Sequence, residues 1–400
     1  MDLISGRPFW PIKSGLLQSF PPLLNDASCE VAVIGGGITG ALVAHQLVSA
    51  GVDTLLLDKR DIGFGSTAAS TGFLSYENDV PLHRLIGMIG EEKAVRSYQV
   101  SFDAVRKFKA LAGGLDGSSG YVQRESLYLA SSERDLGGLR TEFETRRRCG
   151  FDVEWCTKAD LARHTTLPHW GAILTRDTAQ IDTYRFTNAL LARASRKGLR
   201  AFDRTAVTRH LVRPRGVELL TERGTRVRAR QVVVATGYEA LSDLRGAPTS
   251  LHSTYAIVSE PLTSFAGWPR QRMMWETARP YLYLRATEDG RAMLGGYDEP
   301  FRDPRRRDEL LTWKTQLLAR KFKRILPKID FEVAYAWTGT FAETPDGLPY
   351  IGEHPDHPRM YFALGYGGNG ITYGFIAAEI ITALCLGRKN PDAGIFRFGR

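Results

Sequence analysis

The stretch Glu30-Val-Ala-Val-Ile-Gly-Gly-Gly-Ile-Thr-Gly40 decides the fold of this chain. Its first five residues, 30–34, form a short apolar and β-branched run that is typical of a buried strand. Small and apolar residues over 41–50 then predict a helix that ends at Gly51. A second strand is expected over 53–58. The chain therefore opens with a β-α-β unit.

The glycines of this stretch have the spacing Gly35-x-Gly37-x-x-Gly40, between a strand and a helix, which indicates a dinucleotide site. Gly35 allows a tight turn, Gly37 lets the backbone approach a pyrophosphate, and Gly40 lets the helix pack closely on the strand. The N–H groups that begin the helix, at Ile38 and Thr39, offer a partial positive charge to phosphates.

The residue that ends the second strand is Asp58, about twenty residues beyond the glycines, where an acid binds ribose hydroxyls. A carboxylate at this place disfavours a 2′-phosphate. Lys59 and Arg60 follow directly, so this motif predicts a dinucleotide and leaves NADP open.

A second small and hydroxyl-rich loop, Gly63-Phe-Gly-Ser-Thr-Ala-Ala-Ser-Thr-Gly72, follows the second strand. Such a loop can supply N–H and O–H donors to phosphate and ribityl oxygens, and a plain NAD dehydrogenase has no need of it. We therefore expect FAD. The expected contacts in this loop are Gly65, Ser66, Thr67, Ala68, Ser70 and Thr71.

Composition favours an ordinary globular protein. The net charge of +9 is modest for 400 residues, so no nucleic-acid partner is expected. Four scattered cysteines without a C-x-x-C pair favour free thiols and a cytoplasmic location. No signal peptide is expected, and no membrane span, because the longest apolar stretch, 373–386, contains Glu379 and is short. No metal site is expected: the 353–357 stretch has ligand-type residues but is interrupted by proline and interpreted as a surface loop.

Five segments occur in an order that resembles the FAD-dependent D-amino-acid oxidase superfamily, which includes glycine, sarcosine and γ-glutamylputrescine oxidases. They are the opening unit, the 63–72 loop, Ala235-Thr-Gly237, Thr344-Pro-Asp-Gly347 and Gly365-Tyr-Gly-Gly-Asn-Gly370. The resemblance covers residues 21–387. The early Phe9-Trp10 and Pro21-Pro22 are most similar to the γ-glutamylputrescine oxidase branch.

The pattern of elements and the resemblance together predict an α/β fold with an α+β insert. Helices and strands alternate at the start, and strands dominate later. We expect a Rossmann-like, discontinuous FAD-binding domain made of residues 1–85, 155–245 and 330–400. A substrate domain with a mixed or antiparallel sheet is expected over 86–154 and 246–329.

The resemblance also implies further FAD contacts. Backbone groups at Val207 would meet the adenine, and Ala235, Thr236 and Gly237 would pass its ribose. Asp346 would lie near the ribityl chain. The glycine-rich loop and the start of the last helix would approach the flavin ring through Gly368, Asn369, Gly370, Ile371 and Thr372.

Two departures from the family pattern bear on the chemistry. Relatives that hold FAD covalently do so at places that here fall on Gly339 and Ala69, so we expect non-covalent FAD. Met293 stands where sarcosine oxidase has a lysine that promotes reaction with oxygen. The electron acceptor is therefore left open between oxygen and another molecule.

Substrate contacts are expected from an aromatic strand and from the loop that follows Gly72. Arg285 could clamp a carboxylate or could be a solvated residue on an exposed strand face. Glu77 could receive a second ammonium group or could be an ordinary loop carboxylate. The complete set of candidates is Tyr76, Glu77, Tyr281, Tyr283, Arg285, Tyr297 and Thr372.

These observations predict an enzyme that oxidises a C–N bond of an amine or amino acid by hydride transfer to flavin N5, after which the imine hydrolyses. Such chemistry depends on geometry more than on acid–base groups. The alternatives are an NAD(P)-dependent dehydrogenase or monooxygenase, and a flavoprotein that acts on tRNA through the basic helix expected over 305–328. A homo- or hetero-oligomer is possible in each case.

Overall fold

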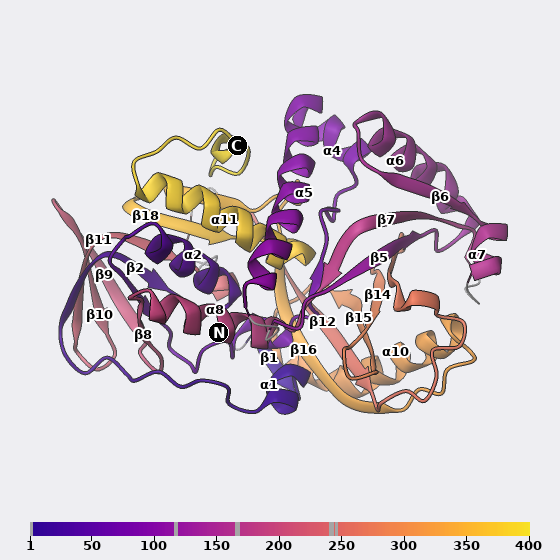
Figure 1. Cartoon of the computed structure of the whole chain (residues 1–400), viewed down its shortest axis with the longest axis horizontal. Coiled ribbons are helices and arrows are strands. Elements are labelled where there is room, and N and C mark those ends of the chain that lie inside the picture. The colour runs from indigo at the N-terminus through magenta and orange to yellow at the C-terminus, as the bar shows by residue number, and fades with distance from the viewer. Residues whose placement is uncertain (1–2, 116–118, 165–168, 240–243, 245–246) are drawn as a thin grey trace.

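Two β-sheets carry the fold, and helices pack on both of them (Figure 1). The computed structural model describes residues 3–115, 119–164, 169–239, 244 and 247–400. The first sheet, named here the parallel sheet, has the strand order β17-β18-β11-β2-β3-β8, and β10 and β9 extend it from β11. Neighbours from β18 to β8 run parallel, whereas β17, β10 and β9 pair antiparallel.

The centre of the parallel sheet is the β-α-β unit that the glycine motif predicts. β2 (Ala27–Ile34) is followed by α2 (Ile38–Ser49) and β3 (Thr54–Leu57). In the register of the sheet, Ile34 lies beside Leu57 on one side and Val234 on the other. The other strands are β8 (Arg200–Phe202), β9 (Val207–Arg213), β10 (Gly216–Thr221), β11 (Arg226–Val234), β17 (Tyr350–His354) and β18 (His357–Leu364).

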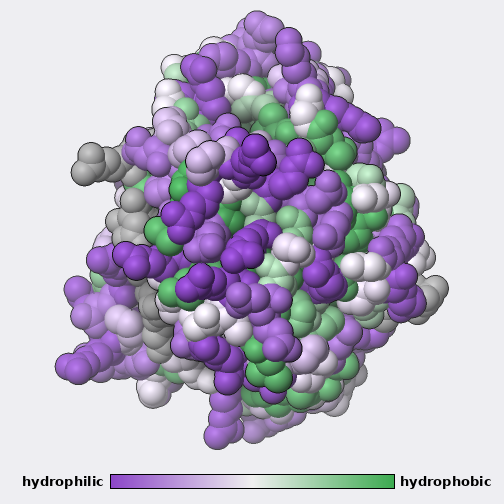
Figure 2. Space-filling model, turned by 90° about the vertical axis from the view of Figure 1, so that its left-hand side faces the viewer, coloured by the Kyte–Doolittle hydropathy of each residue, from purple (hydrophilic) through white to green (hydrophobic). Residues whose placement is uncertain are grey.

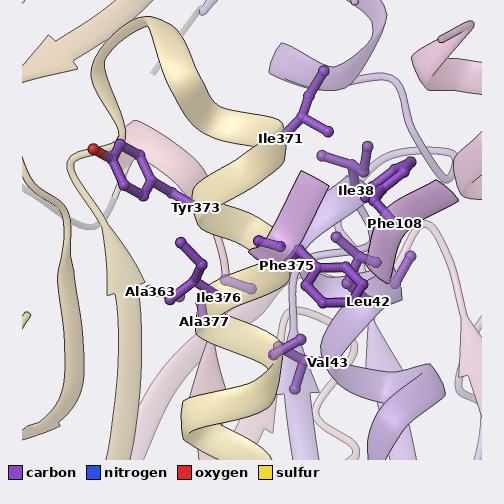
Figure 3. Packing of buried hydrophobic residues seen from close by; sticks show 14 of the residues in the cluster. Ile38, Leu42, Val43, Phe108, Ala363, Ile371, Tyr373, Phe375, Ile376 and Ala377 are labelled. Carbon is purple, nitrogen blue, oxygen red and sulfur yellow. The ribbon is translucent and has the colours of Figure 1, made fainter. Parts of the chain in front are cut away.

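The core on one face of this sheet is built by helices that are distant in sequence. α11 (Gly370–Cys385) packs against α2 and against α5 (Glu91–Gly113), and α8 (Thr183–Arg196) packs against α2. Figure 3 shows the α11 side chain Phe375 beside Leu42 of α2 and Phe108 of α5. The rings of Phe108 and Phe375 have centroids 5.9 Å apart.

The second sheet, named the mixed sheet, has the order β1-β16-β12-β15-β14-β13-β5-β7-β4, with β6 paired to β7. All its neighbours are antiparallel except β13 and β5. Its strands are β1 (Ile4–Gly6), β4 (Phe73–Leu74), β5 (Val122–Leu129), β6 (Val153–Thr157), β7 (Gly171–Gln180), β12 (Ser250–Ser259), β13 (Met273–Glu276), β14 (Leu282–Ala286), β15 (Ala292–Glu299) and β16 (Val333–Glu343).

The remaining helices flank the two sheets. They are α1 (Phe9–Ser14), α3 (Ser66–Ala69), α4 (Leu82–Ile89), α6 (Leu136–Arg148), α7 (Lys158–His164), α9 (Pro304–Glu309) and α10 (Leu311–Ile325). The basic helix expected over 305–328 is thus two helices, and α10 buries Leu318 and Phe322 against the mixed sheet.

The sheets divide the chain differently from the expected domains. β7 and β16 belong to the mixed sheet. They lie within residues 155–245 and 330–400, which we expected to be part of the FAD-binding domain. The N-terminal residues also join the mixed sheet, because β1 pairs with β16 and Trp10 of α1 is buried. Sheet pairing depends on partners far along the chain, which local sequence pattern does not reveal.

Two polar stretches contain side chains that the structure buries. The highly charged helix α6 buries Glu142 and Arg146. The 353–357 stretch, interpreted as a surface loop, is the exposed turn of a hairpin between β17 and β18, although His354 within the stretch is buried. The described residues contain no cluster that could hold a metal ion.

The segment Gly367–Cys385, which includes α11, is long and apolar enough by composition to cross a bilayer. It packs instead against α2 and α5 in the core of the parallel sheet. Its apolar character is therefore that of a core helix. Figure 2 shows that the end of the molecule formed by the parallel sheet is largely hydrophilic, with hydrophobic residues scattered among polar ones.

Gly40 sets the distance between α2 and the turn that precedes it. A Cβ at this position would lie 1.8 Å from the carbonyl oxygen of Gly35. We predict that Gly40→Ala lowers the free energy of unfolding by about 3 kcal/mol, because α2 must shift away from the turn.

Thermal and chemical unfolding of the purified variant measures this loss. Gly113→Ala is the matched control, because a Cβ at Gly113 meets no atom within 4 Å. Equal stability of the two variants would contradict the close approach.

Candidate functional site

A cavity of about 390 Å³ lies between the two sheets, at the carboxyl ends of the parallel strands. Its lining includes the residues that directly follow β2, β3 and β11, namely Gly35, Asp58 and Ala235. The loop between β18 and α11 also lines it. The carboxyl ends of strands are where open α/β sheets bind their ligands.

The glycine turn leaves room for a ligand by bringing backbone close to backbone. Gly35 has φ +111°, and a Cβ there would lie 2.4 Å from the carbonyl oxygen of Ala235. The N–H of Ile38 donates to Oγ1 of Thr67 at 2.9 Å, which ties the start of α2 to the hydroxyl-rich loop. Both predicted segments thus face one cavity.

Asp58 holds the shape of this turn from the next strand. Its Oδ2 accepts the N–H of Gly36 at 2.6 Å, and its Oδ1 accepts that of Arg60 at 2.8 Å. Burial raises the pKa of the carboxyl, and these two N–H donors oppose the shift. Lys59 and Arg60, whose positive charges kept NADP as an alternative cofactor, both form ion pairs with Glu239. The distances are 2.6 Å for Lys59 and 2.9 Å for Arg60.

The carbonyl groups of the hydroxyl-rich loop are held by side chains from elsewhere in the fold. Trp10 Nε1 donates to the Ser70 oxygen at 2.7 Å, and Trp337 Nε1 donates to the Ala69 oxygen at 2.9 Å. The hydroxyl of Thr183 donates to the Thr67 oxygen at 2.7 Å. With these acceptors engaged, the loop can present its remaining amide and hydroxyl groups to a ligand.

Arg285 completes this clamp. Its Nη1 lies 2.9 Å from the Thr71 oxygen, 3.0 Å from that of Gly72 and 2.9 Å from that of Ile181. The side chain is 2% exposed and lies outside the cavity lining. Arg285 therefore does not clamp a substrate carboxylate as expected, because its guanidinium binds backbone carbonyl groups. It is also not a solvated residue on an exposed strand face, because it is buried.

The aromatic strand reaches the far end of the cavity. Tyr281, just before β14, and Tyr283, within β14, both line it, together with Trp275 of β13. Asp79 accepts the N–H of Gly368 at 2.6 Å and contacts the hydroxyl of Tyr281. A Cβ at Gly295 would collide with the Tyr283 hydroxyl, so this glycine lets the ring lie across β15.

Glu77 lines the same end and is the centre of a buried network. Its Oε1 accepts Arg146 Nη1 and the Thr175 hydroxyl, and its Oε2 accepts the hydroxyls of Ser75 and Ser126 at 3.2 Å each. Both oxygens are thus engaged. Glu77 is therefore a structural acceptor in this arrangement, and the ammonium contact considered for it has no support.

The network continues from Arg146 to the surface helices. Arg146 Nε donates to Glu142 Oε1 at 2.6 Å, and Glu142 also accepts the backbone N–H groups of Leu82 and His83 at the start of α4. Burial by itself raises the pKa of Glu142, but the guanidinium of Arg146 and the bonds from His83 and Leu82 hold it down at about 2.

Most of the expected cofactor residues line this one cavity. They are Gly35, Gly37, Ile38, Thr39, Asp58, Lys59, Gly65, Ser66, Thr67, Ser70, Thr71, Val207, Ala235, Thr236, Gly237, Gly339, Gly368, Asn369, Gly370 and Ile371. Four lie outside its lining. Gly40 packs on the Gly35 turn, Ala68 is buried within α3, Asp346 pairs with Arg400 at 2.8 Å, and the Thr372 hydroxyl donates to the Ser75 carbonyl oxygen at 2.7 Å.

The substrate candidates divide in the same way. Glu77, Tyr281 and Tyr283 line the cavity. Tyr76 instead stacks on Phe151 in the core, with centroids 5.3 Å apart, and Tyr297 packs beside the cluster around α10. These two, with Arg285 and Thr372, have no place in the cavity lining.

Sequence reasoning missed several lining residues. Asn78, Thr254, Trp275 and Asp298 come from four separate segments, and no short motif contains them. Asp298 directly follows the candidate Tyr297 on β15, and the structure places Asp298, not Tyr297, in the cavity lining.

The fold and cavity are those of a dinucleotide-binding protein in which a second, mixed sheet faces the cofactor-type cavity. The family model described as "FAD dependent oxidoreductase" matches residues 30–384. The chain therefore belongs to this family of FAD-dependent oxidoreductases.

Individual relatives are distant but match over nearly their whole length. Glycine oxidase of Bacillus subtilis (strain 168) is 26% identical, over 91% of this chain and 95% of the relative. Gamma-glutamylputrescine oxidoreductase of Escherichia coli (strain K12) is 26% identical, over 92% and 86%. The crystal structure of glycine oxidase from Geobacillus kaustophilus has a TM-score of 0.77, with 21% identity, over 94% of this chain and 99% of that one.

The cavity fits FAD by its unsatisfied polar atoms as well as by its glycines. Ser66 Oγ and Asn78 Nδ2 are buried, line the cavity and have no hydrogen-bond partner among the described residues. Buried polar groups are rarely left unpaired in folded proteins, so both indicate a polar ligand.

We predict that Arg146→Met lowers the free energy of unfolding by about 3–5 kcal/mol, because it leaves Glu77 and Glu142 as buried carboxylates without a cation. Arg148→Met, two residues along α6, is the control. The pair of Arg148 with Glu91 is more than half exposed, and its loss costs at most about 1 kcal/mol. Denaturant unfolding of both variants gives the comparison, and equal losses would show that the buried network contributes nothing.

Proposed function

We propose that this protein is an FAD-dependent enzyme that oxidises the C–N bond of a small amine or amino acid. The observation that carries the proposal is the continuity of the cavity, which runs from the glycine turn and Asp58 to the tyrosine-lined end beside β14. Proteins named for oxidation of glycine and γ-glutamylputrescine are similar over almost the whole chain. When bound, FAD supplies the acceptor for a hydride equivalent.

The chain's own residues would bind and position the cofactor and the substrate. The N–H groups at the start of α2, and the donors of Ser66, Thr67, Ser70 and Thr71, would hold the phosphates and ribityl oxygens. Asp58 would accept a ribose hydroxyl with its remaining lone pairs. The Gly368–Ile371 segment would lie against the ring, and Tyr281 and Tyr283 would confine the substrate near it.

The two places where relatives attach FAD covalently lie side by side. A Cβ at Gly339 would be 3.6 Å from Cβ of Ala69, and both residues line the cavity. Neither side chain can form a bond to the flavin, which supports non-covalent binding. Met293 is fully buried beside Trp337 and Phe9, outside the cavity lining, so the choice of electron acceptor rests on other residues. All four cysteines are free, which fits the cytoplasmic location that we propose.

Non-covalent binding predicts that acid precipitation of the purified protein releases all its flavin into the supernatant. Absorbance of the supernatant and of the redissolved pellet measures the partition. Colour that stays with the precipitated polypeptide would contradict the assignment of Gly339 and Ala69.

The function itself is tested by the visible spectrum of the purified protein, before and after a panel of amines and amino acids is added without oxygen. We expect flavin bands that one class of donor bleaches. The rate at which admitted air restores the colour then separates an oxidase from a dehydrogenase. A protein that stays colourless after FAD is supplied would overturn the proposal and favour a nicotinamide enzyme.

A further inference from the structure

Five carboxylates line the described part of the cavity: Asp58, Glu77, Asp79, Glu239 and Asp298. The first four are engaged with donors of the protein. Asp58 accepts two backbone N–H groups, Glu77 binds Arg146 and three hydroxyls, Asp79 accepts Gly368 N–H, and Glu239 binds Lys59 and Arg60.

Asp298 differs from the other four. It contacts the hydroxyl of Thr254, but its Oδ1 is buried and has no hydrogen-bond partner among the residues that the structure describes. Burial raises the pKa of Asp298 to about 7. The nearby carboxylates of Glu343 and Asp79 add to this shift, whereas the Thr254 contact and the Lys314 ammonium group oppose it. A buried carboxylate oxygen without a hydrogen-bond donor is stabilised when a cation enters the cavity and binds it.

A distortion of β15 places Asp298 at this point. In the pairing of β15 with β12, Gly296 lies opposite Tyr255 and Glu299 lies opposite Ser253. The chain therefore advances by three residues along β15 but by only two along β12. The extra residue is a β-bulge, and Tyr297 within it has φ +56°, which is strained for a residue with a side chain. Bulges beside active sites re-aim a side chain, and here Asp298 and Thr254 both line the cavity.

The described lining at this end of the cavity has no free cation, although Arg279 lies next to it, 4.9 Å from the centre of the Tyr281 ring and bound to the Asp79 carbonyl oxygen. The described lining residues include two cations, Lys59 and Arg60, and both bind Glu239 near Asp58. Arg285 is held by backbone carbonyls, and Lys314 binds the Tyr297 oxygen and Glu299. A substrate carboxylate would therefore enter among Glu77, Asp79 and Asp298, where no cation of the described lining is free to receive it.

We propose that Asp298 binds the ammonium group of the substrate, so that the cavity selects small cationic amines and has no requirement for a substrate carboxylate. This inference rests on the proposed function and specifies the substrate class of the same site. The hydroxyls of Tyr281 and Tyr283 would border the bound ammonium, and their rings would cover the apolar carbon chain.

The test uses the FAD-loaded enzyme and three ligands of equal chain length: n-butylamine, n-butanol and butyrate. Binding is followed anaerobically by perturbation of the flavin spectrum and by calorimetry. In the wild type we expect n-butylamine to bind more tightly than n-butanol, and butyrate to bind most weakly. In Asp298→Asn we expect affinity for n-butylamine to fall about 30-fold or more, and affinity for n-butanol to stay within about threefold.

Glu299→Gln is the matched control, because Glu299 is the adjacent carboxylate and lies outside the cavity lining, bound to Lys314. It should keep the wild-type order of affinities. The Asp298→Ser variant is measured with the same three ligands, so that an effect caused only by the introduced asparagine can be recognised. The FAD content and the melting temperature show whether each variant is folded.

Two results would overturn the inference: tighter binding of butyrate than of n-butylamine by the wild type, or an unchanged amine affinity in the Asp298 variants. The wild-type comparison holds even if a variant does not fold. Failure of the proposed function has a different signature, which is a wild-type protein that takes up no FAD. If FAD binds and only amino acids bleach it, the function stands and the assignment of Asp298 falls.

Discussion

The structure depends on the way its hydroxyl-rich loop is held between the two sheets. Arg285 of the mixed sheet reaches the carbonyl oxygens of Thr71, Gly72 and Ile181, and Trp10 and Trp337 bind two further carbonyls of the loop. Backbone acceptors that are buried must be paired, and a buried guanidinium needs several acceptors. The guanidinium of Arg285 and the buried carbonyl groups therefore satisfy one another's hydrogen-bonding capacity. The loop that faces the cavity is held by side chains that lie outside the cavity.

This clamp also explains the glycine that ends the loop. Gly72 has φ +76°, and a Cβ there would lie 2.7 Å from Arg285 Nη1 and 2.2 Å from the Ile181 oxygen. The close approach joins β4 and β7 of the mixed sheet to the turn after β3 of the parallel sheet. The cavity therefore forms where the two sheets meet. The parallel sheet builds the end at the glycine turn, and the mixed sheet builds the tyrosine-lined end.

Buried charge has two different roles in this junction. Glu77, Arg146 and Glu142 form a closed network in which each carboxylate has a cation, and such a network fixes geometry. Asp298 is held by a strained bulge with one oxygen unpaired, which costs stability unless a ligand compensates for it. Proteins commonly accept such a cost at the site where they bind or transform a substrate.

The sequence by itself determined the β-α-β unit, the hydroxyl-rich loop and the family, because these depend on residues close together in the chain. Turn glycines, strand-ending acids and hydroxyl runs act through local backbone geometry and leave a readable spacing. Only the tertiary structure decided that Arg285 binds backbone, that Glu142 and Arg146 are buried, and that Asp298 faces the cavity. These facts depend on sheet register, on a single bulge and on partners more than fifty residues away, for which the linear order of residues carries no local signal.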